Sequence, residues 1–504
     1  MKTISITASL IIFSLLFSGC RIRPEQQKAT NPDPLYQPEW ISLQRHQTPE
    51  WFLDAKFGIY CHWGPYSVPA YQTEWYSHRM YLEGDPIRAY HESTYGPVHE
   101  FGYKDFIPMF TAERFDADEW AELFLRAGAK FGGPVSEHAD GFAMWDSRLT
   151  RWDAKDMGPR RDVVGEMAVA LRKRGLKFIA TYHRHWMYAW FPTWDPQADA
   201  SDPALSGLYG PKVPAGTFVM ASQPTVPLPD EQFNREWYDR IVEVVDKYEP
   251  DLVWFDNKMD IIDEKYRLKF LSHYYNAGNR QGREVVATYK FTDFQPGSAV
   301  LDLERARMSE SKPFPWLTDD SIDWKAWCDI QNPDYKSVNR LVDFLVDVVS
   351  KNGCLLLNIT PQANGEIPAP VRERLLAMGD WLRINGEAIY GTRPWVMYGE
   401  GPTEIVEGHL SERRNADHSA QDIRYTTRGD ALYAIVLDWP TDQVVLPALG
   451  TNSKWYGQQI GSVKLLGYEE ELEWEQKVQG LVIKLGARPR DLEHAFVFRI
   501  NGKP

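Results

Sequence analysis

The sequence predicts an α/β protein: a (β/α)8-type, TIM-like barrel followed by a C-terminal antiparallel β-sandwich domain. The first observation is a repeated alternation of helical and strand patterns over roughly 350 residues, which favours a parallel sheet. The second is a change after Pro394 to short alternating runs broken by turns, such as 431–437 and 480–485. The third is the length of 504 residues, enough for a large domain and a smaller one. An open doubly wound sheet is the second candidate for the first domain.

The alternation begins with a short buried strand at 56–62. Asp116 is then a helix cap with Glu119 as its capping-box partner, which predicts a helix over 120–129 and a strand over 131–136. Further helix and strand pairs follow at 162–174 with 176–182, 232–248 with 251–255, 263–277 with 284–289, and 335–351 with 354–359. The segment 195–229 lacks periodicity and is predicted to be a long loop over the C-terminal face of the barrel.

The N-terminus has the pattern of an export signal. Lys2 precedes an apolar stretch from Ile4 to Phe17, and Ser18-Gly19-Cys20 follows. This pattern resembles a bacterial lipoprotein signal, which predicts cleavage after residue 19, lipidation of Cys20 and a place in the cell envelope; a plain secretory signal is the alternative. We therefore expect a signal at 1–20, a linker at 21–37, the barrel at 38–393 and the β-domain at 394–504.

Composition narrows the classes of function. A net charge of −14 argues against a nucleic-acid partner. The 20 Trp, 25 Tyr and 23 Phe are consistent with stacking on sugar rings, although such residues also build cores. Beyond Cys20, the cysteines Cys61, Cys328 and Cys354 are too widely spaced to indicate a disulfide framework or a thiolate zinc site. No glycine-rich phosphate loop is present in the sequence.

Polar residues gather where the predicted strands end. Each one alone has an ordinary explanation as a cap, a surface charge or a buried histidine. Together at one barrel rim they predict a polar pocket with aromatic walls. The residues are His62, Glu74, Glu137, His138, Tyr182, His183, Asp256 and Glu304.

Five segments resemble glycoside hydrolase family 29, the α-L-fucosidases, over roughly residues 40–400. They are Trp51–Gly64, Glu74–Tyr76, Asp140–Asp146, Gly158–Asp162 and Leu357–Pro361. The resemblance implies a catalytic barrel, a C-terminal β-domain and a retaining mechanism without a metal or an organic cofactor. It also implies a fucosylated glycan or polysaccharide as the substrate.

Site residues follow from the resemblance by position. Asp256 in Trp254-Phe255-Asp256 matches the nucleophile. The positions that match residues holding the sugar are His62, Glu74, Trp75, His138 and Trp254, with Tyr182 or His183 as a further pocket residue.

A retaining glycosidase needs a second carboxyl about 5 Å from the nucleophile. Glu304 in Leu301–Glu304 is our candidate; a structural ion pair with Arg305 or Arg307 is the alternative explanation of Glu304. Lys290 stands where many relatives carry an arginine, and we expect it to be a pocket cation at most. Other candidates for the acid are Glu310, Asp319 and Asp320.

One position departs from the family pattern. Many members have two histidines before Asp-Gly-Phe, whereas here Ala139 follows His138. We expect the missing hydrogen bond to be lost or supplied by His183 or His185, and Glu137 is a candidate for orienting the His138 imidazole. The leading hypothesis is an exo-acting, retaining α-L-fucosidase. The alternatives are a fucose-binding protein that has lost activity and a relative with another glycone preference, such as α-L-galactosides.

Overall fold

The computed structural model describes residues 35–217 and 227–503. Its first part is a closed barrel of eight strands in the order β1 to β8, with every neighbouring pair parallel. The predicted fold class is confirmed. The strands are β1 (Phe57–Cys61), β2 (Phe131–Glu137), β3 (Lys177–Tyr182), β4 (Leu252–Phe255), β5 (Val286–Tyr289), β6 (Val300–Asp302), β7 (Trp316–Ser321) and β8 (Gly353–Ile359).

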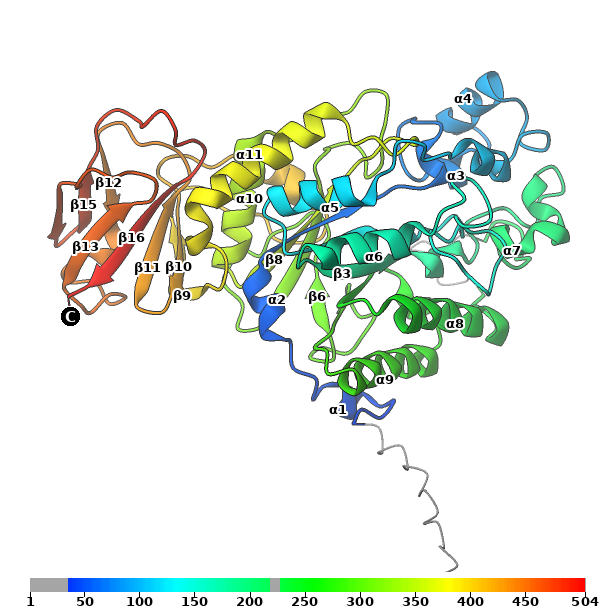
Figure 1. Ribbon diagram of the computed structural model, residues 1–504, viewed down its shortest axis with the longest axis horizontal. Coiled ribbons are helices and arrows are strands. Elements are labelled where there is room, and N and C mark those ends of the chain that lie inside the picture. Colours follow the sequence, from blue (N-terminus) through cyan, green and yellow to red (C-terminus); the bar gives the residue numbers. More distant parts are fainter. Residues whose placement is uncertain (1–34, 218–226, 504) are drawn as a thin grey trace, which may run out of the picture. The chain divides into compact units, whose positions relative to one another are not determined.

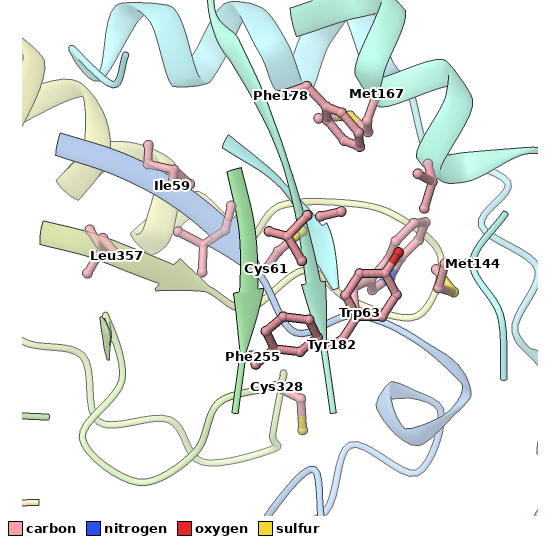
Figure 2. Close-up of a cluster of buried hydrophobic side chains, with 14 of the residues drawn as sticks. Ile59, Cys61, Trp63, Met144, Met167, Phe178, Tyr182, Phe255, Cys328 and Leu357 are labelled. Carbon is pink, nitrogen blue, oxygen red and sulfur yellow. The ribbon is translucent and has the colours of Figure 1, made fainter. Parts of the chain in front are cut away.

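Side chains of the barrel strands alternate between two hydrophobic layers, because successive residues of a strand point to opposite faces. Tyr60 and Trp254 belong to the interior cluster. Ile59, Cys61 and Phe255 belong to the outer cluster, which packs against the surrounding helices (Figure 2). This alternation decides which residues beyond each strand end reach the pocket.

Helices α5, α6, α8 and α9 lie outside the barrel strands (Figure 1). The N-termini of these helices are capped by aspartates, namely Asp116, Asp162, Asp230 and Asp263. Asp116 is the cap that the sequence predicts, and it accepts a hydrogen bond from the Glu119 amide at 3.0 Å. The helices are α1 (Trp40–Leu43), α2 (Glu50–Ala55), α3 (Tyr76–Arg79), α4 (Pro86–Thr94), α5 (Ala117–Arg126), α6 (Val163–Lys173), α7 (Ser206–Tyr209), α8 (Glu231–Tyr248), α9 (Glu264–Arg280), α10 (Val338–Ser350) and α11 (Ala369–Asn385).

Strands β6 and β7 are missing from the sequence prediction. β6 has only three residues, and β7 contains the run Thr-Asp-Asp-Ser, which does not resemble a buried strand although every residue of β7 is buried. Residues 290–299 and 303–315, all described, contain no helix, so the regular helix-strand repeat fails here.

The segment 195–229 is more ordered than predicted in its described part. It contains α7 and two short 3₁₀ turns, Asp199–Ser201 and Pro203–Leu205. The Asp199 carboxylate accepts hydrogen bonds from Tyr209 of the same segment at 2.5 Å and from Tyr81 at 2.7 Å, and the bond from Tyr81 connects the segment to the loop region after β1.

The C-terminal part consists of two antiparallel sheets with a separate hydrophobic core. A five-stranded sheet has the order β13-β16-β11-β10-β9, and a three-stranded sheet has the order β12-β15-β14. Arg424 of β10 pairs with Asp347 of α10 at 2.6 Å, which joins this part to the barrel. The strands are β9 (Arg393–Glu400), β10 (Ile423–Arg428), β11 (Ala431–Val436), β12 (Gln443–Leu446), β13 (Ile460–Leu465), β14 (Trp474–Lys477), β15 (Gly480–Lys484) and β16 (Phe496–Gly502).

The predicted signal, the predicted lipidation site Cys20 and the part of the predicted linker before Leu35 lie outside the described residues. Within the described ranges, no helix has the length and apolar character needed to cross a membrane. Cys61, Cys328 and Cys354 are buried free thiols.

Candidate active site

A cavity of about 510 Å³ opens at the carboxyl ends of the barrel strands, a size suited to a small ligand. Seven of the predicted pocket residues line it, and Lys290 lies beneath it. The seven are His62, Glu74, Trp75, His138, His183, Trp254 and the candidate nucleophile Asp256; the candidate acid Glu304 lines the cavity as well.

Strand alternation explains why these residues meet. Tyr60, Trp254 and Val300 face the barrel interior. Each of them lies an even number of positions before a pocket residue further along the chain, which is residue 62, 256 or 304 respectively. The side chains two or four residues further along therefore face the same way and reach the pocket floor.

Tyr182 does not reach the cavity, so its assignment as a pocket residue is wrong. Its side chain points to the opposite face of β3 from that of His183. It packs in the outer layer beside Phe255, with ring centroids 6.0 Å apart (Figure 2). His183, one residue later, occupies the pocket position.

Asp256 and Glu304 both contact the ammonium group of Lys290. Lys290 Nζ lies 3.3 Å from Asp256 Oδ1 and 3.0 Å from Glu304 Oε2, so these two oxygens are no further apart than the sum of the two distances. This upper bound on the oxygen–oxygen distance is compatible with the roughly 5 Å carboxyl spacing of retaining glycosidases.

Lys290 is a larger part of the site than predicted. Its side chain is only 1% exposed, and its ammonium group also lies 3.1 Å from Asp319 Oδ1 and 3.7 Å from Asp302 Oδ2. These four carboxylates raise the pKa of Lys290 well above its usual value even though burial opposes the charge. One buried cation therefore holds four acidic side chains together.

The protonation preferences of the acidic pair are set by different surroundings. Burial raises the pKa of Asp256 to about 6, against the opposing effect of Lys290. Burial also acts to raise the pKa of Glu304, but Lys290 and His409 hold that pKa well below its usual range. In the free site a proton is therefore taken up by Asp256 before Glu304.

The other candidates for the acid are differently placed. Asp319 lines the cavity, but its second oxygen accepts a hydrogen bond from Tyr60 at 2.9 Å. The Asp320 side chain forms a buried ion pair with Lys336 outside the cavity, and Glu310 is exposed and does not line the cavity. Glu304 is not paired with its neighbouring arginines, since Arg305 donates to backbone carbonyls and Arg307 pairs with Glu412.

Three imidazoles form the other side of the floor. His62 Nε2 lies 3.2 Å from His183 Nε2, and the His138 and His183 ring centroids are 4.4 Å apart. Burial lowers the pKa of His62 to about 4 and those of His138 and His183 well below 6.5, so all three rings are neutral at pH 7. A neutral imidazole both donates and accepts hydrogen bonds, which suits sugar hydroxyl groups.

Among the described residues, these three histidines are also the one group whose spacing could hold a metal ion, with a donor atom of each within 4.8 Å of the others. Asn358 of β8 fixes the orientation of the first ring: its side-chain oxygen accepts hydrogen bonds from the His62 amide at 2.8 Å and from Nδ1 at 2.9 Å. The Asn358 amide group is itself fixed, because it donates to Ser321 Oγ and to the Trp327 carbonyl. His62 Nε2 is thus left as an acceptor.

Two expectations about the departure at Ala139 are corrected. Glu137 does not orient His138: a register shift in β2 turns the Glu137 side chain outward, where it pairs with Arg184 at 2.6 Å and Arg240 at 2.9 Å. His185 does not line the cavity, since its ring bonds to the Asn257 carbonyl at 2.6 Å. His183 is the histidine that stands beside His138.

Several cavity residues were not predicted. Two of them, His409 and Leu410, come from the segment between β9 and β10, more than 40 residues after the last barrel strand. Asp293 is a further carboxyl of the cavity, and burial raises its pKa to about 8. Asp319, an alternative candidate for the acid, lines the cavity too. The remaining unpredicted residues are Trp186, Asn257, Lys258, Asp260, Phe291, Thr292 and Trp327.

Comparison with known proteins agrees with the geometry. The family model described as Alpha-L-fucosidase matches residues 24–387, and that described as Alpha-L-fucosidase C-terminal domain matches residues 415–501. The chain is 33% identical over 469 residues to the tissue alpha-L-fucosidase of Rattus norvegicus, with 90% of this chain and 89% of that protein covered. It is 32% identical over 509 residues to the tissue alpha-L-fucosidase of Homo sapiens, with 98% and 97% covered.

A solved structure of the Thermotoga maritima alpha-fucosidase in complex with fucose superposes with a TM-score of 0.71 at 30% identity. The match covers 92% of this chain and 99% of that one. The chain therefore belongs to the α-L-fucosidase family of glycoside hydrolases.

Proposed function

We propose that the protein is an exo-acting, retaining α-L-fucosidase that releases terminal α-L-fucosyl residues from glycans or fucose-containing polysaccharides. The observation that carries the proposal is the shared contact of Asp256 and Glu304 with Lys290, which supports a neighbouring pair of carboxyls of the kind that double displacement needs. Family membership supports fucose as the glycone.

In the first step, an Asp256 oxygen attacks the anomeric carbon while the glycosidic bond breaks, and the Glu304 carboxyl gives its proton to the departing oxygen. In the second step, the Glu304 carboxylate takes a proton from water. The water oxygen bonds to the anomeric carbon, and the Asp256 carboxylate leaves. His62, His138 and His183 hold hydroxyls of the sugar from the floor, and Glu74 and Trp75 do so from the loop after β1.

This sequence of steps needs Asp256 ionised and Glu304 protonated, the reverse of the order in the free site. A bound sugar supplies the reversal in two ways. It excludes water from Glu304, which favours the neutral acid, and positive charge developing at the anomeric carbon favours the Asp256 anion.

The test compares the wild type with Asp256→Asn on nitrophenyl α-L-fucoside and α-L-galactoside, with fucose binding followed by calorimetry. Release of nitrophenol from the fucoside by the wild type alone supports the proposal. Fucose binding without release by either protein indicates a binding protein, and faster release from the galactoside indicates the other glycone.

We further propose export of the chain as a lipoprotein anchored through Cys20, on the basis of the Ser18-Gly19-Cys20 sequence after an apolar stretch. Expressed in a bacterium that processes lipoproteins, the wild type is expected in the membrane fraction with a diacylglyceryl mass on Cys20. Cys20→Ser should leave the protein without that mass. An unmodified wild-type Cys20 would contradict the proposal.

A further inference from the structure

The mouth of the cavity carries two large apolar side chains that face solvent. Phe291 is 56% exposed and Leu410 is 55% exposed, and both line the cavity. Exposed apolar surface at the rim of a polar pocket is typical of a surface that a ligand covers.

Both residues adopt a backbone conformation that side chains rarely take. Phe291 has φ 49° and Leu410 has φ 57°, in the left-handed region that favours glycine. Such conformations persist only where the surroundings enforce them, and they gather at ligand sites. Here the conformation is combined with exposure, so burial of the side chain in the core does not explain it.

His409 joins the two residues to the candidate acid. Its ring centroid lies 4.6 Å from that of Phe291, and its Nε2 lies 3.4 Å from Glu304 Oε2. The Leu410 amide donates to the Glu304 carbonyl at 2.8 Å. Phe291, His409 and Leu410, which we call the rim platform, are thus fixed on the side of the cavity where Glu304 lies.

The segment that carries His409 and Leu410 is firmly held. The Glu412 amide donates to the Arg305 carbonyl at 2.8 Å, and the buried Glu412 carboxylate pairs with Arg307 at 2.7 Å and with Arg340 at 2.6 Å. The fold therefore fixes His409 and Leu410 in place relative to Glu304. The contacts of Glu412 join the segment after β9 to the barrel.

An acid that protonates the departing oxygen must lie beside the leaving group. We propose, on the basis of the proposed function, that the rim platform is the leaving-group subsite and that it takes the apolar face of a pyranose ring. Phe291 and Leu410 supply the apolar surface, and Thr292 and Asp293, which also line the cavity, are the polar groups next to Phe291 in the chain that can bond to hydroxyls of that ring.

The test measures kcat and KM of the wild type, Phe291→Gly and Leu410→Gly on two kinds of substrate. One is α-L-fucosyl fluoride, whose leaving group is a single atom. The other is a panel of α-L-fucosyl disaccharides linked to O2 of galactose and to O3, O4 or O6 of N-acetylglucosamine. Glycine accepts a positive φ without strain, so neither variant should melt at a lower temperature than the wild type.

For each enzyme, kcat/KM on a disaccharide is divided by kcat/KM on fucosyl fluoride. For at least one disaccharide this ratio should be about tenfold lower in each glycine variant than in the wild type, a loss of ~1.4 kcal/mol of transition-state binding. The matched control is Phe314→Ala, which removes a 45% exposed phenyl ring outside the cavity and should leave the ratio as in the wild type. Ratios within twofold of the wild type in both glycine variants, for every disaccharide, would overturn the subsite. A wild type that hydrolyses neither kind of substrate would refute the proposed function instead.

Discussion

Asp256 and Glu304 stand at the ends of different barrel strands, yet their carboxylates contact the same ammonium group, that of Lys290. The contact keeps two like charges close together, which without a cation would cost several kcal/mol. Four predictions depend on this arrangement.

Replacing the candidate nucleophile should stop turnover without unfolding the protein. We expect Asp256→Ala to lower kcat on nitrophenyl α-L-fucoside at least about 10³-fold, because the covalent step has no substitute. Added azide should restore release and yield a fucosyl azide of inverted anomeric configuration, measured by NMR. Asp380→Ala, which removes an exposed carboxylate of α11, is the control. Full activity of Asp256→Ala would remove this residue from the reaction.

Replacing the candidate acid should have an effect that depends on the leaving group. Glu304→Ala should lose about 10²–10⁴-fold on fucosyl disaccharides and far less on the first step with nitrophenyl fucosides, whose departing oxygen needs no proton. Asp293→Asn provides the comparison, because Asp293 also lines the cavity and burial raises its pKa to about 8, so that it holds a proton near neutral pH. If Asp293→Asn shows the leaving-group dependence and Glu304→Ala does not, Asp293 is the acid.

Removing the shared cation should destabilise the fold. Lys290→Met leaves Asp256, Asp302, Glu304 and Asp319 without their counter-charge, and breaking a buried ion pair costs about 3–5 kcal/mol. The loss should be larger at pH 8 than at pH 5, because carboxyls whose pKa has risen take up protons at the lower pH. Thermal melting at the two pH values measures this difference, with Lys290→Arg as the control that keeps the charge. An equal loss at both pH values would contradict the role of Lys290.

The pH dependence of the first step should reveal the pKa of the candidate nucleophile, Asp256. With α-L-fucosyl fluoride the departing atom needs no proton, so kcat/KM should fall as pH drops through about 6, where Asp256 takes up a proton. Activity is expected above this pH and lost below it. If kcat/KM fell only near the ordinary aspartate pKa of about 3.9, burial would not raise the pKa of Asp256 in solution.

Much of the fold was predictable because helical and strand periodicities are local. Aspartate caps such as Asp116 and the apolar runs of β1, β3, β4 and β8 carried enough signal. β7 was not predictable, since its buried aspartates are compensated by Lys290 and Lys336, partners distant in the sequence.

The candidate site was predictable where alternation along a strand could be followed. Counting by twos from Ile179 gives 181 and then His183 and excludes Tyr182, but the structure is needed to show that Ile179 faces the barrel interior, because both faces of β3 are buried. His409 and Leu410 had no such signal, because they reach the cavity through tertiary contacts of the segment after β9.

The central claim is that Asp256 forms a covalent bond to the sugar, and trapping that bond tests it most directly. The wild type is incubated with 2-deoxy-2-fluoro-α-L-fucosyl fluoride and digested, and the peptide that contains β4 is sequenced by mass spectrometry. The double-displacement mechanism predicts one fluorofucosyl ester, located on Asp256. An ester on Glu304 or Asp293, or β-L-fucose as the first product with no covalent adduct, would contradict it.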